Sequence, residues 1–268
     1  MKHNAQWHSA TIRAQRDLSP SVREFEIRPE RGVRPWSVGS HLDLRVVVDG
    51  REEKRSYSLV GLPHAPGDAP GADEVYRIAV RRAEPGRGGS RWLWGLQTGD
   101  ELLIGEPNNH FEIGWQAPYT LLVAGGIGIT PILGMALQLA QRGAPLRMLY
   151  AARCTDELIY RDTLQAALGE RLCTLCSDAG QRIDLDAEIA ALPSGGQLTL
   201  CGPLSLMDAA RAAWQRSGRP AAGLRFETFG NSGQHEAETF WVELPRHGLR
   251  FEVPAGRNLL DMLEEHGV

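Results

Sequence analysis

Hydrophobic and polar residues alternate through most of the first 114 residues, in short runs separated by clusters of Gly, Pro and Asp. Alternation predicts half-buried strands of an antiparallel sheet, because successive side chains of a strand point to opposite faces. Residues 88–99 have the apolar spacing of a helix instead. We therefore predict an antiparallel β-barrel with strands in SATIRAQRD, VREFEIRP, SHLDLRVVV, RSYSLVG, VYRIAVRRA and DELLIGEP.

From about residue 115 the pattern changes to continuous apolar runs, each followed by helical spacing. Residues 121–124 predict a strand buried on both faces, followed by a helix in PILGMALQLAQRG. RMLYAARC and LTLCGP predict two more buried strands, the second leading into a helical SLMDAARAAWQRSG. Alternating strands and helices predict a doubly wound parallel sheet, whose ligands bind at the carboxyl ends of its strands.

A glycine turn follows the first of these buried strands. Gly125, Gly126 and Gly128 free the backbone to turn tightly and to approach a ligand, and Thr130 and Pro131 suit a helix start as cap and first-turn proline. The N–H groups and the dipole at such a helix start favour a pyrophosphate, so we predict a dinucleotide site. The spacing differs from G-x-G-x-x-G, and a purely structural turn stays an alternative.

Two segments of the predicted barrel could bind a phosphorylated ring system. In RSYS, alternation places Arg55 and Tyr57 on one face and Ser56 and Ser58 on the other. Arg suits phosphate, Tyr can stack on a ring, and Ser can reach a ring nitrogen. In RGGS (residues 87–90), backbone N–H groups and a serine precede a helix. Taken alone, each could be an ordinary strand or turn.

Composition narrows the class of protein. The chain has 268 residues, 42% of them hydrophobic and 23% charged, without a long apolar run or an N-terminal apolar segment. Four Cys argue against a disulfide scaffold and favour the cytoplasm. The length predicts two domains, with room for a small third piece, and we expect a monomer. Because the Lys and Arg residues form no basic footprint, we expect no nucleic acid and no membrane as partner.

The last 38 residues carry the whole net charge of −4, with 3 Lys and Arg against 7 Asp and Glu. Residues 239–244 and 249–253 predict two strands, and a helix carrying Leu259, Leu260 and Leu263 follows. The acidity could be a solvated face or part of a module with its own partner.

Three motifs in the second half of the chain carry less weight. CTLC (residues 173–176) could be a redox or zinc pair, but a second ligand pair is missing and a packed strand is favoured, so we predict no metal site. GNSGQ (residues 230–234) lacks the last glycine of G-x-S-x-G, and HEAET at residues 235–239 lacks the second histidine of H-E-x-x-H.

Taken in order, RSYS, GRGGS, GGIGITP, CGPLSLM and FETFG resemble the ferredoxin–NADP reductase-like superfamily across almost the whole chain. GEPNNHFEI adds a resemblance to the phthalate dioxygenase reductase and vanillate demethylase reductase group, the reductases of two-component Rieske oxygenases. The resemblance implies an FMN-binding barrel (1–114), an NAD(P)H-binding α/β domain (115–230), and a linker with the start of a β-grasp, plant-type ferredoxin domain (231–268).

The resemblance also implies residue roles. Ser58, Thr130, Cys201 and Glu227 are the implied catalytic residues, with Ser58 near flavin N5. The implied flavin contacts are Arg55, Ser56, Tyr57, Ser58, Arg87, Gly88, Gly89 and Ser90. The implied nucleotide contacts are Gly125, Gly126, Gly128, Thr130, Arg153, Cys201, Gly202, Pro203 and Phe229.

The implied activity is hydride transfer from NADH to FMN, with single electrons passing through a [2Fe-2S] centre to a terminal Rieske-type oxygenase. That centre needs a C-x₄-C-x₂-C loop, which we expect only in a longer form. Arg153 after a strand favours NADPH and the resembled group favours NADH; we predict NADH. The alternatives are a stand-alone FAD-dependent flavin or ferric reductase and a non-catalytic flavin-binding subunit. FAD would need an adenine platform on the barrel; no aromatic-bearing loop stands out for one, although residues 62–71 are long enough to host something.

Overall fold

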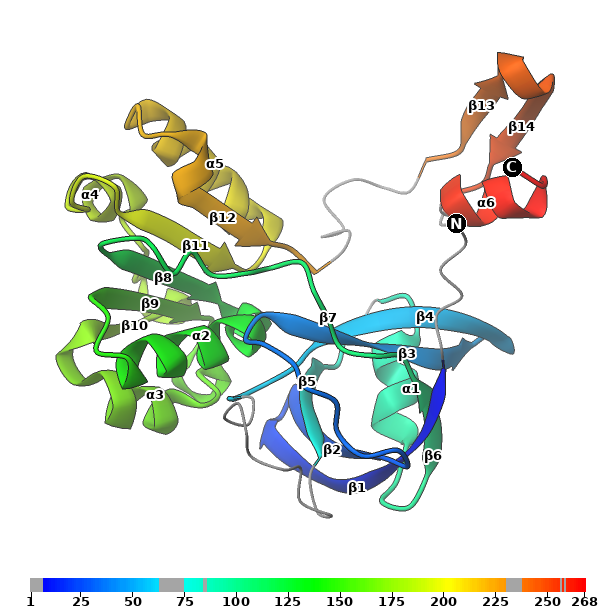
Figure 1. The fold of residues 1–268 in the computed structure, drawn as a ribbon, viewed down its shortest axis with the longest axis horizontal. Coiled ribbons are helices and arrows are strands. Elements are labelled where there is room, and N and C mark those ends of the chain that lie inside the picture. Colours follow the sequence, from blue (N-terminus) through cyan, green and yellow to red (C-terminus); the bar gives the residue numbers. More distant parts are fainter. Residues whose placement is uncertain (1–6, 63–74, 84–85, 230–237, 256, 258) are drawn as a thin grey trace. The chain divides into compact units, whose positions relative to one another are not determined.

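The computed structural model describes residues 7–62, 75–83, 86–229, 238–255, 257 and 259–268 (Figure 1). It divides into two compact units, Met1–Phe229 and Gly230–Val268, which are described separately. Most of the loop at residues 62–71, the GNSGQ motif and the start of HEAET lie outside the described residues.

An antiparallel sheet forms the first half of the larger unit. Its strands run in the order β4-β3-β6-β1-β2-β5, with β7 paired to β3, and a bridge between Leu59 and Ile78 joins the two ends of the path into a barrel. Helix α1 covers this barrel and buries Leu93 in its core. The predicted barrel is confirmed. Its elements are β1 (His8–Ser19), β2 (Val22–Pro29), β3 (Ser40–Val48), β4 (Arg51–Ser58), β5 (Tyr76–Arg81), α1 (Gly89–Gly95), β6 (Glu101–Ile104) and β7 (Asn108–Asn109).

A five-stranded parallel sheet forms the second half, in the order β10-β9-β8-β11-β12. Leu122 and Ala124 pack with α2 and α3 on one face, whereas Leu121 and Val123 pack with α4 and α5 on the other. The doubly wound sheet is therefore confirmed. Its elements are β8 (Thr120–Gly125), η1 (Gly126–Gly128), α2 (Ile129–Gln141), β9 (Leu146–Ala152), η2 (Thr155–Glu157), α3 (Arg161–Leu168), η3 (Gly169–Arg171), β10 (Leu172–Cys176), η4 (Ser177–Ala179), α4 (Leu185–Ala190), β11 (Gln197–Cys201), α5 (Leu204–Arg216), η5 (Ala221–Gly223) and β12 (Leu224–Glu227).

One of the hydrophobic clusters joins the barrel to the parallel sheet. Val22, Val38 and Val60 of the barrel belong to the same buried cluster as residues of α2. The backbones also approach closely, since a Cβ at Gly134 of α2 would lie 2.2 Å from the carbonyl oxygen of Gly61. The two sheets therefore hold their ligand-facing edges as parts of one packed body.

The smaller unit is a hairpin and a helix: β13 (Phe240–Leu244), η6 (Pro245–His247), β14 (Leu249–Val253) and α6 (Leu259–Glu265). Phe251, Val253 and Met262 form its small core, and the ring of His266 stacks on Phe251 at 4.1 Å between centroids. The predicted order of strand, turn, strand and helix is present.

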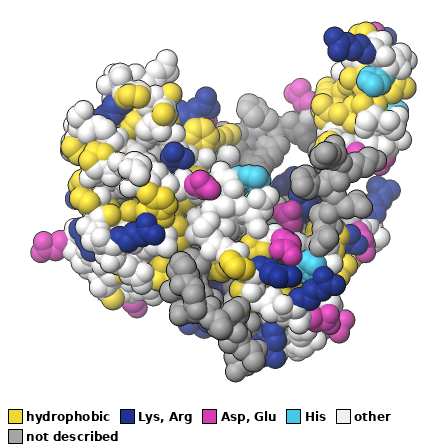
Figure 2. Space-filling model, viewed as in Figure 1, with side chains coloured by type: hydrophobic (Ala, Val, Ile, Leu, Met, Phe, Trp, Pro, Cys, Tyr) yellow, Lys and Arg dark blue, Asp and Glu magenta, His cyan; other side chains and the backbone are white. Residues whose placement is uncertain are grey.

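None of the helices in the described ranges has the length and apolar character needed to cross a membrane. Figure 2 shows Lys and Arg interspersed with Asp and Glu over the visible face of the barrel.

Candidate functional site

The parallel sheet has a switch point between β8 and β11, where the chain changes the face that its helices cover (Figure 1). In such sheets the crevice beside the carboxyl ends of the two central strands is the usual ligand site. The two glycine-containing turns of the sequence, at residues 125–128 and 201–203, both lie at this edge.

These two turns pack against each other through their backbones. A Cβ at Gly128 would lie 2.2 Å from the carbonyl oxygen of Cys201, and one at Gly202 would lie 3.1 Å from Cα of Gly125. Pro203 Cδ would lie 2.8 Å from a Cβ at Gly125. Gly126 differs: its φ is +53° and no described atom lies within 4 Å of a Cβ there. The turn is therefore packed tightly against the end of β11, whereas the space beside Gly126 is free of described atoms.

Thr130 does not cap the helix, so that prediction is wrong. Helix α2 begins at Ile129 with Gly128 at its N-cap, and the buried Thr130 hydroxyl donates to the carbonyl of Ile127 at 3.0 Å. The reason is that the 3₁₀ turn η1 runs directly into α2, which places Thr130 inside the first turn. Pro131 lies in the first turn, as predicted.

Cys201 and Glu227 are paired neighbours at the ends of β11 and β12. Burial raises the pKa of the Cys201 thiol well above its usual value, and the Glu227 carboxylate adds to this shift. Burial also raises the pKa of Glu227 to about 7. Its Oε2 is buried and has no hydrogen-bond partner among the described residues. The site thus holds a carboxyl with a pKa near neutral and a buried oxygen without a hydrogen-bond partner among the described residues.

Two further predicted residues follow strands β9 and β12 at the carboxyl edge of the parallel sheet. Phe229, two residues after β12, is 43% exposed. Arg153 directly follows β9, and its exposed guanidinium pairs with Asp178 of η4 at 3.4 Å between Nε and Oδ1. Sequence reasoning missed Asp178, because its approach to Arg153 depends on β9 and β10 ending side by side.

In the barrel, Arg55 of β4 lies against the glycine loop before α1. Its Nη2 donates to the carbonyl of Arg87 at 3.2 Å and pairs with Glu53 at 2.5 Å. A Cβ at Gly89 would lie 2.9 Å from Arg55 Cγ, and Gly88 has a φ of +80°. The fold therefore brings together two motifs that are about thirty residues apart in sequence.

Tyr57 shares the face of Arg55, as the alternation predicts. Burial raises its pKa to about 12, although Arg55 and Arg87 lower it. The Ser56 hydroxyl points to the other face, where it donates to Asp43 Oδ1 at 2.5 Å, so the structure does not bring it to the Arg55 side.

The two other serines of these motifs lie in different settings. Ser58, at the end of β4, is buried. Ser90 accepts a hydrogen bond from the Ala83 amide at 3.2 Å, which leaves its own proton free to donate.

Comparisons with known proteins agree that the chain resembles the reductase components of oxygenase systems. Residues 122–212 match the model of the oxidoreductase NAD-binding domain. The chain is 35% identical over 260 residues to the heme-dependent oxidative N-demethylase beta subunit of Ectopseudomonas mendocina, covering 96% of this chain and 80% of that protein. It is 31% identical to the phthalate dioxygenase reductase of Burkholderia cepacia, covering 96% and 79% of the two chains. This chain belongs to the oxygenase reductase family.

A solved structure of phthalate dioxygenase reductase superimposes with a TM-score of 0.77 at 29% identity, over 98% of this chain and 81% of that one. That reductase has a modular structure for electron transfer from pyridine nucleotides to [2Fe-2S]. The family resemblance and the fold class expected from the sequence are confirmed. The chain is an NAD-binding oxidoreductase and an electron-transfer reductase component of the oxygenase reductase family.

The cysteines of this oxygenase reductase are not grouped as metal ligands among the described residues. Cys173 and Cys176 are on β10, which is the packed strand that the sequence favoured. Among the described residues, no group of three or more His, Cys, Asp or Glu side chains is placed to hold a metal ion.

Proposed function

We propose that this chain takes a hydride from NADH onto FMN held by the barrel and passes the electrons on singly to a terminal Rieske-type oxygenase. A [2Fe-2S] centre of a longer form would relay them. The observation that carries the proposal is the pairing of Cys201 and Glu227 beside the glycine turn, with a buried carboxylate oxygen that has no hydrogen-bond partner among the described residues. Membership of the oxygenase reductase family supports oxidoreductase chemistry for the chain.

The barrel residues fit the phosphate of FMN. The Arg55 guanidinium, the unpaired N–H groups of the first turn of α1 and the free proton of Ser90 supply the donors, with Arg87 at the rim. The Glu53 carboxylate now pairs with Arg55, and a bound phosphate would take its place on the guanidinium. Gly88 and Gly89 let the backbone come close. When bound, the flavin accepts two electrons with a hydride and releases them one at a time. Tyr57 would pack against its ring, with Ser58 near N5.

Replacing Arg55 by alanine is expected to weaken FMN binding about tenfold or more, because a charge-assisted contact to phosphate is lost. Equilibrium titration of the flavin-free chain by fluorescence measures this. Arg45→Ala is the matched control, since Arg45 is on the same hairpin and also pairs with a glutamate, Glu52, but makes no hydrogen bond to the loop before α1 among the described residues. An unchanged affinity in Arg55→Ala would contradict the assignment.

For the nucleotide, Gly125, Gly126 and Gly128 at the start of α2 suit the pyrophosphate. Thr130, Cys201, Gly202 and Pro203 would lie around the nicotinamide, and Phe229 would close the site from the end of β12. The chain's task is to hold nicotinamide C4 at about 3–3.5 Å from flavin N5. An ionised Glu227 beside the ring would favour the positive charge that develops as the hydride leaves.

The pair Arg153–Asp178 supports NADH over NADPH. A 2′-phosphate near Arg153 would also meet the Asp178 carboxylate, which already neutralises the guanidinium. We expect Asp178→Asn to lower the ratio of kcat/KM for NADH to kcat/KM for NADPH about tenfold, because it removes the repulsion between the Asp178 carboxylate and the 2′-phosphate. Asp186→Asn, which breaks the similar exposed pair with Arg216, is the control and should leave the ratio unchanged. An unchanged ratio in Asp178→Asn would contradict this role.

The electron acceptor has a second candidate. The relative that is 35% identical is named a heme-dependent oxidative N-demethylase subunit. A haem-containing demethylase is therefore the alternative to a Rieske-type oxygenase as partner. We further propose that the chain is a cytoplasmic monomer. The competing interpretations of its function are a stand-alone FAD-dependent reductase and a non-catalytic flavin-binding subunit.

The proposal is tested by loading the chain with FMN and, in parallel, with FAD, and assaying ferricyanide reduction by NADH. We expect FMN to bind more tightly and NADH-driven turnover to require it. Preference for FAD would favour the stand-alone reductase. A loaded chain with no turnover on NADH or NADPH would favour the non-catalytic subunit.

A further inference from the structure

A polar contact joins the barrel to the loop that follows β9. The Tyr160 hydroxyl, at the N-cap of α3, donates to Glu24 Oε2 of β2 at 2.6 Å, although the two residues are 136 positions apart. A second contact lies beside it, where the Ser21 hydroxyl donates to Glu157 Oε1 of η2 at 2.7 Å. Both contacts start from the β1–β2 hairpin and end in residues 157–160.

Glu24 is a buried anchor. The residue is 7% exposed, and its other oxygen accepts from Arg16 Nη2 at 2.9 Å. A buried carboxylate is stable only when donors satisfy it, so loss of the Tyr160 hydroxyl leaves one oxygen without its partner. Burial and the neighbouring Glu24 raise the pKa of Tyr160 strongly, so its hydroxyl remains a donor throughout the working range.

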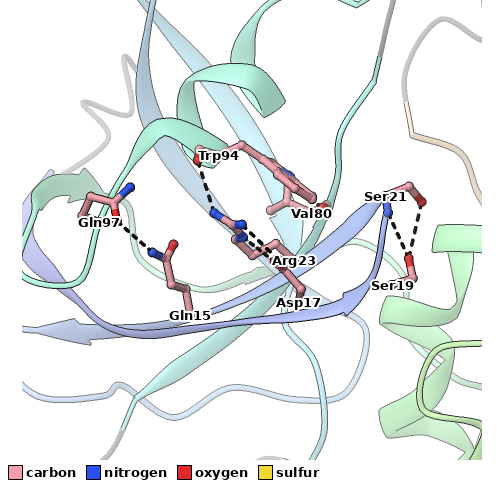
Figure 3. Close-up of polar contacts among 8 residues, drawn as sticks. All are labelled: Gln15, Asp17, Ser19, Ser21, Arg23, Val80, Trp94 and Gln97. Carbon is pink, nitrogen blue, oxygen red and sulfur yellow. Dashed lines mark hydrogen bonds and ion pairs between the residues drawn. The ribbon is translucent and has the colours of Figure 1, made fainter.

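The hairpin that carries Glu24 is itself anchored on its other face (Figure 3). Arg23 donates to Asp17 at 2.6 Å and to the carbonyl of Trp94 at 3.4 Å, and Trp94 Nε1 donates to the carbonyl of Val80 at 3.1 Å. Because side chains alternate along β2, Arg23 ties the hairpin to α1 while Glu24 faces the loop. The hairpin is therefore tied to α1 on the face opposite Glu24.

The loop side is held in a conformation that it would not adopt freely. Tyr160 has a φ of 59°, one of two positive values at non-glycine positions among the described residues. A left-handed conformation at a bulky residue persists when its surroundings impose it, and such residues cluster at functional sites. The hydrogen bond to Glu24 fixes the side chain of Tyr160, and the backbone carbonyl of Tyr160 accepts from the Leu164 amide at 3.0 Å.

The same loop begins at the nucleotide edge. Its first residue, Arg153, directly follows β9 and lies beside η4, and Tyr150 within β9 donates to the carbonyl of Glu157 at 3.3 Å. A shift of residues 157–160 against the barrel would therefore move the wall of the nucleotide site relative to the barrel.

We propose that Tyr160 and Glu24 are positioning residues, which set the distance between the nicotinamide and the flavin by fastening the β9–α3 loop to the β1–β2 hairpin. The inference rests on the proposed hydride transfer. Transfer is steeply sensitive to distance, and a misplacement of about 1 Å can lower the rate about 100-fold. The pair touches neither substrate nor cofactor, so it acts on rate more than on affinity.

The test is anaerobic stopped-flow reduction of the FMN-loaded chain by NADH, with the limiting rate and the apparent Kd measured separately. Tyr160→Phe removes one oxygen atom and is expected to lower the limiting rate about tenfold, with the Kd changed less than about twofold. Glu24→Leu, which removes both acceptor oxygens, should do the same. Adding Tyr160→Phe to it should lower the limiting rate no further, because the contact is already lost. Ser21→Ala should have a smaller effect in the same direction.

Tyr76→Phe is the matched control. It also removes a buried tyrosine hydroxyl, one that accepts from the Arg34 amide within the barrel alone. We expect this variant to lose thermal stability without loss of the limiting rate. If Tyr160→Phe behaves like Tyr76→Phe, losing stability at an unchanged rate, the contact is structural and the inference is overturned. A wild-type chain that neither NADH nor NADPH reduces would overturn the proposed function instead.

Discussion

Replacing Gly128 by alanine is expected to abolish tight nucleotide binding, with the affinity for NADH falling about 100-fold or more. The added Cβ would lie 2.2 Å from the Cys201 carbonyl oxygen and 2.7 Å from the Gly202 amide nitrogen. Both are backbone atoms at the ends of buried strands, so a side-chain rotation cannot relieve the clash. The two turns must separate instead, which distorts the surface that would receive the pyrophosphate.

Titration of NADH by fluorescence quenching, with far-UV circular dichroism and FMN content as checks on folding, measures this effect. Gly95→Ala is the matched control, because no described atom lies within 4 Å of a Cβ there and its φ is outside the positive range. We expect the control to bind NADH like the wild type. A Gly128→Ala chain with normal NADH affinity would show that the two turns do not form the nucleotide site.

Replacing Glu227 by glutamine is expected to make the protein more stable and slower above neutral pH. The pKa of Glu227 is raised from 4.5 to about 7 by burial, so the folded state holds its proton more tightly than the unfolded state. Stability therefore falls as the pH rises between these two values and stays low above them. Glutamine avoids this loss, which is at most about 3.5 kcal/mol, because a change of one in the pKa corresponds to about 1.4 kcal/mol.

The rate should change in the opposite direction. If the ionised carboxylate stabilises the positive charge on the departing nicotinamide, the wild-type rate of flavin reduction rises through a midpoint near 7. Glu227→Gln should be about tenfold slower above that midpoint and independent of pH. Thermal unfolding and stopped-flow reduction near pH 5 and pH 8 test both parts. Equal stability of the two chains near pH 8, or an unchanged pH profile, would contradict the role of Glu227.

Local patterns predicted the elements well, for reasons visible in particular strands. VREFEIRP and SHLDLRVVV coincide with β2 and β3, because alternation with one buried face leaves little freedom in register. Residues 121–124 coincide with the middle of β8, which is buried on both faces. Thr130 shows the limit, since a threonine before a proline looks like a cap whether or not a 3₁₀ turn precedes it.

The candidate site depends on contacts between segments far apart in sequence, and these leave no local pattern. The resemblance to a family named both Arg55 and Gly89, but their contact exists only because β4 and α1 adjoin in the folded barrel. Cys201 and Glu227 become neighbours through the register of β11 with β12. Tyr160 and Glu24 had no signal at all, because a single hydroxyl reaching a single carboxylate changes neither periodicity nor composition.

The most direct measurement is the anaerobic visible spectrum of the FMN-loaded chain before and after addition of NADH. We predict flavin absorption bands that bleach within the mixing time or shortly after it, and that return when ferricyanide is added. Flavin bands that persist with both NADH and NADPH, although dithionite bleaches them, would contradict hydride transfer as the function of this chain.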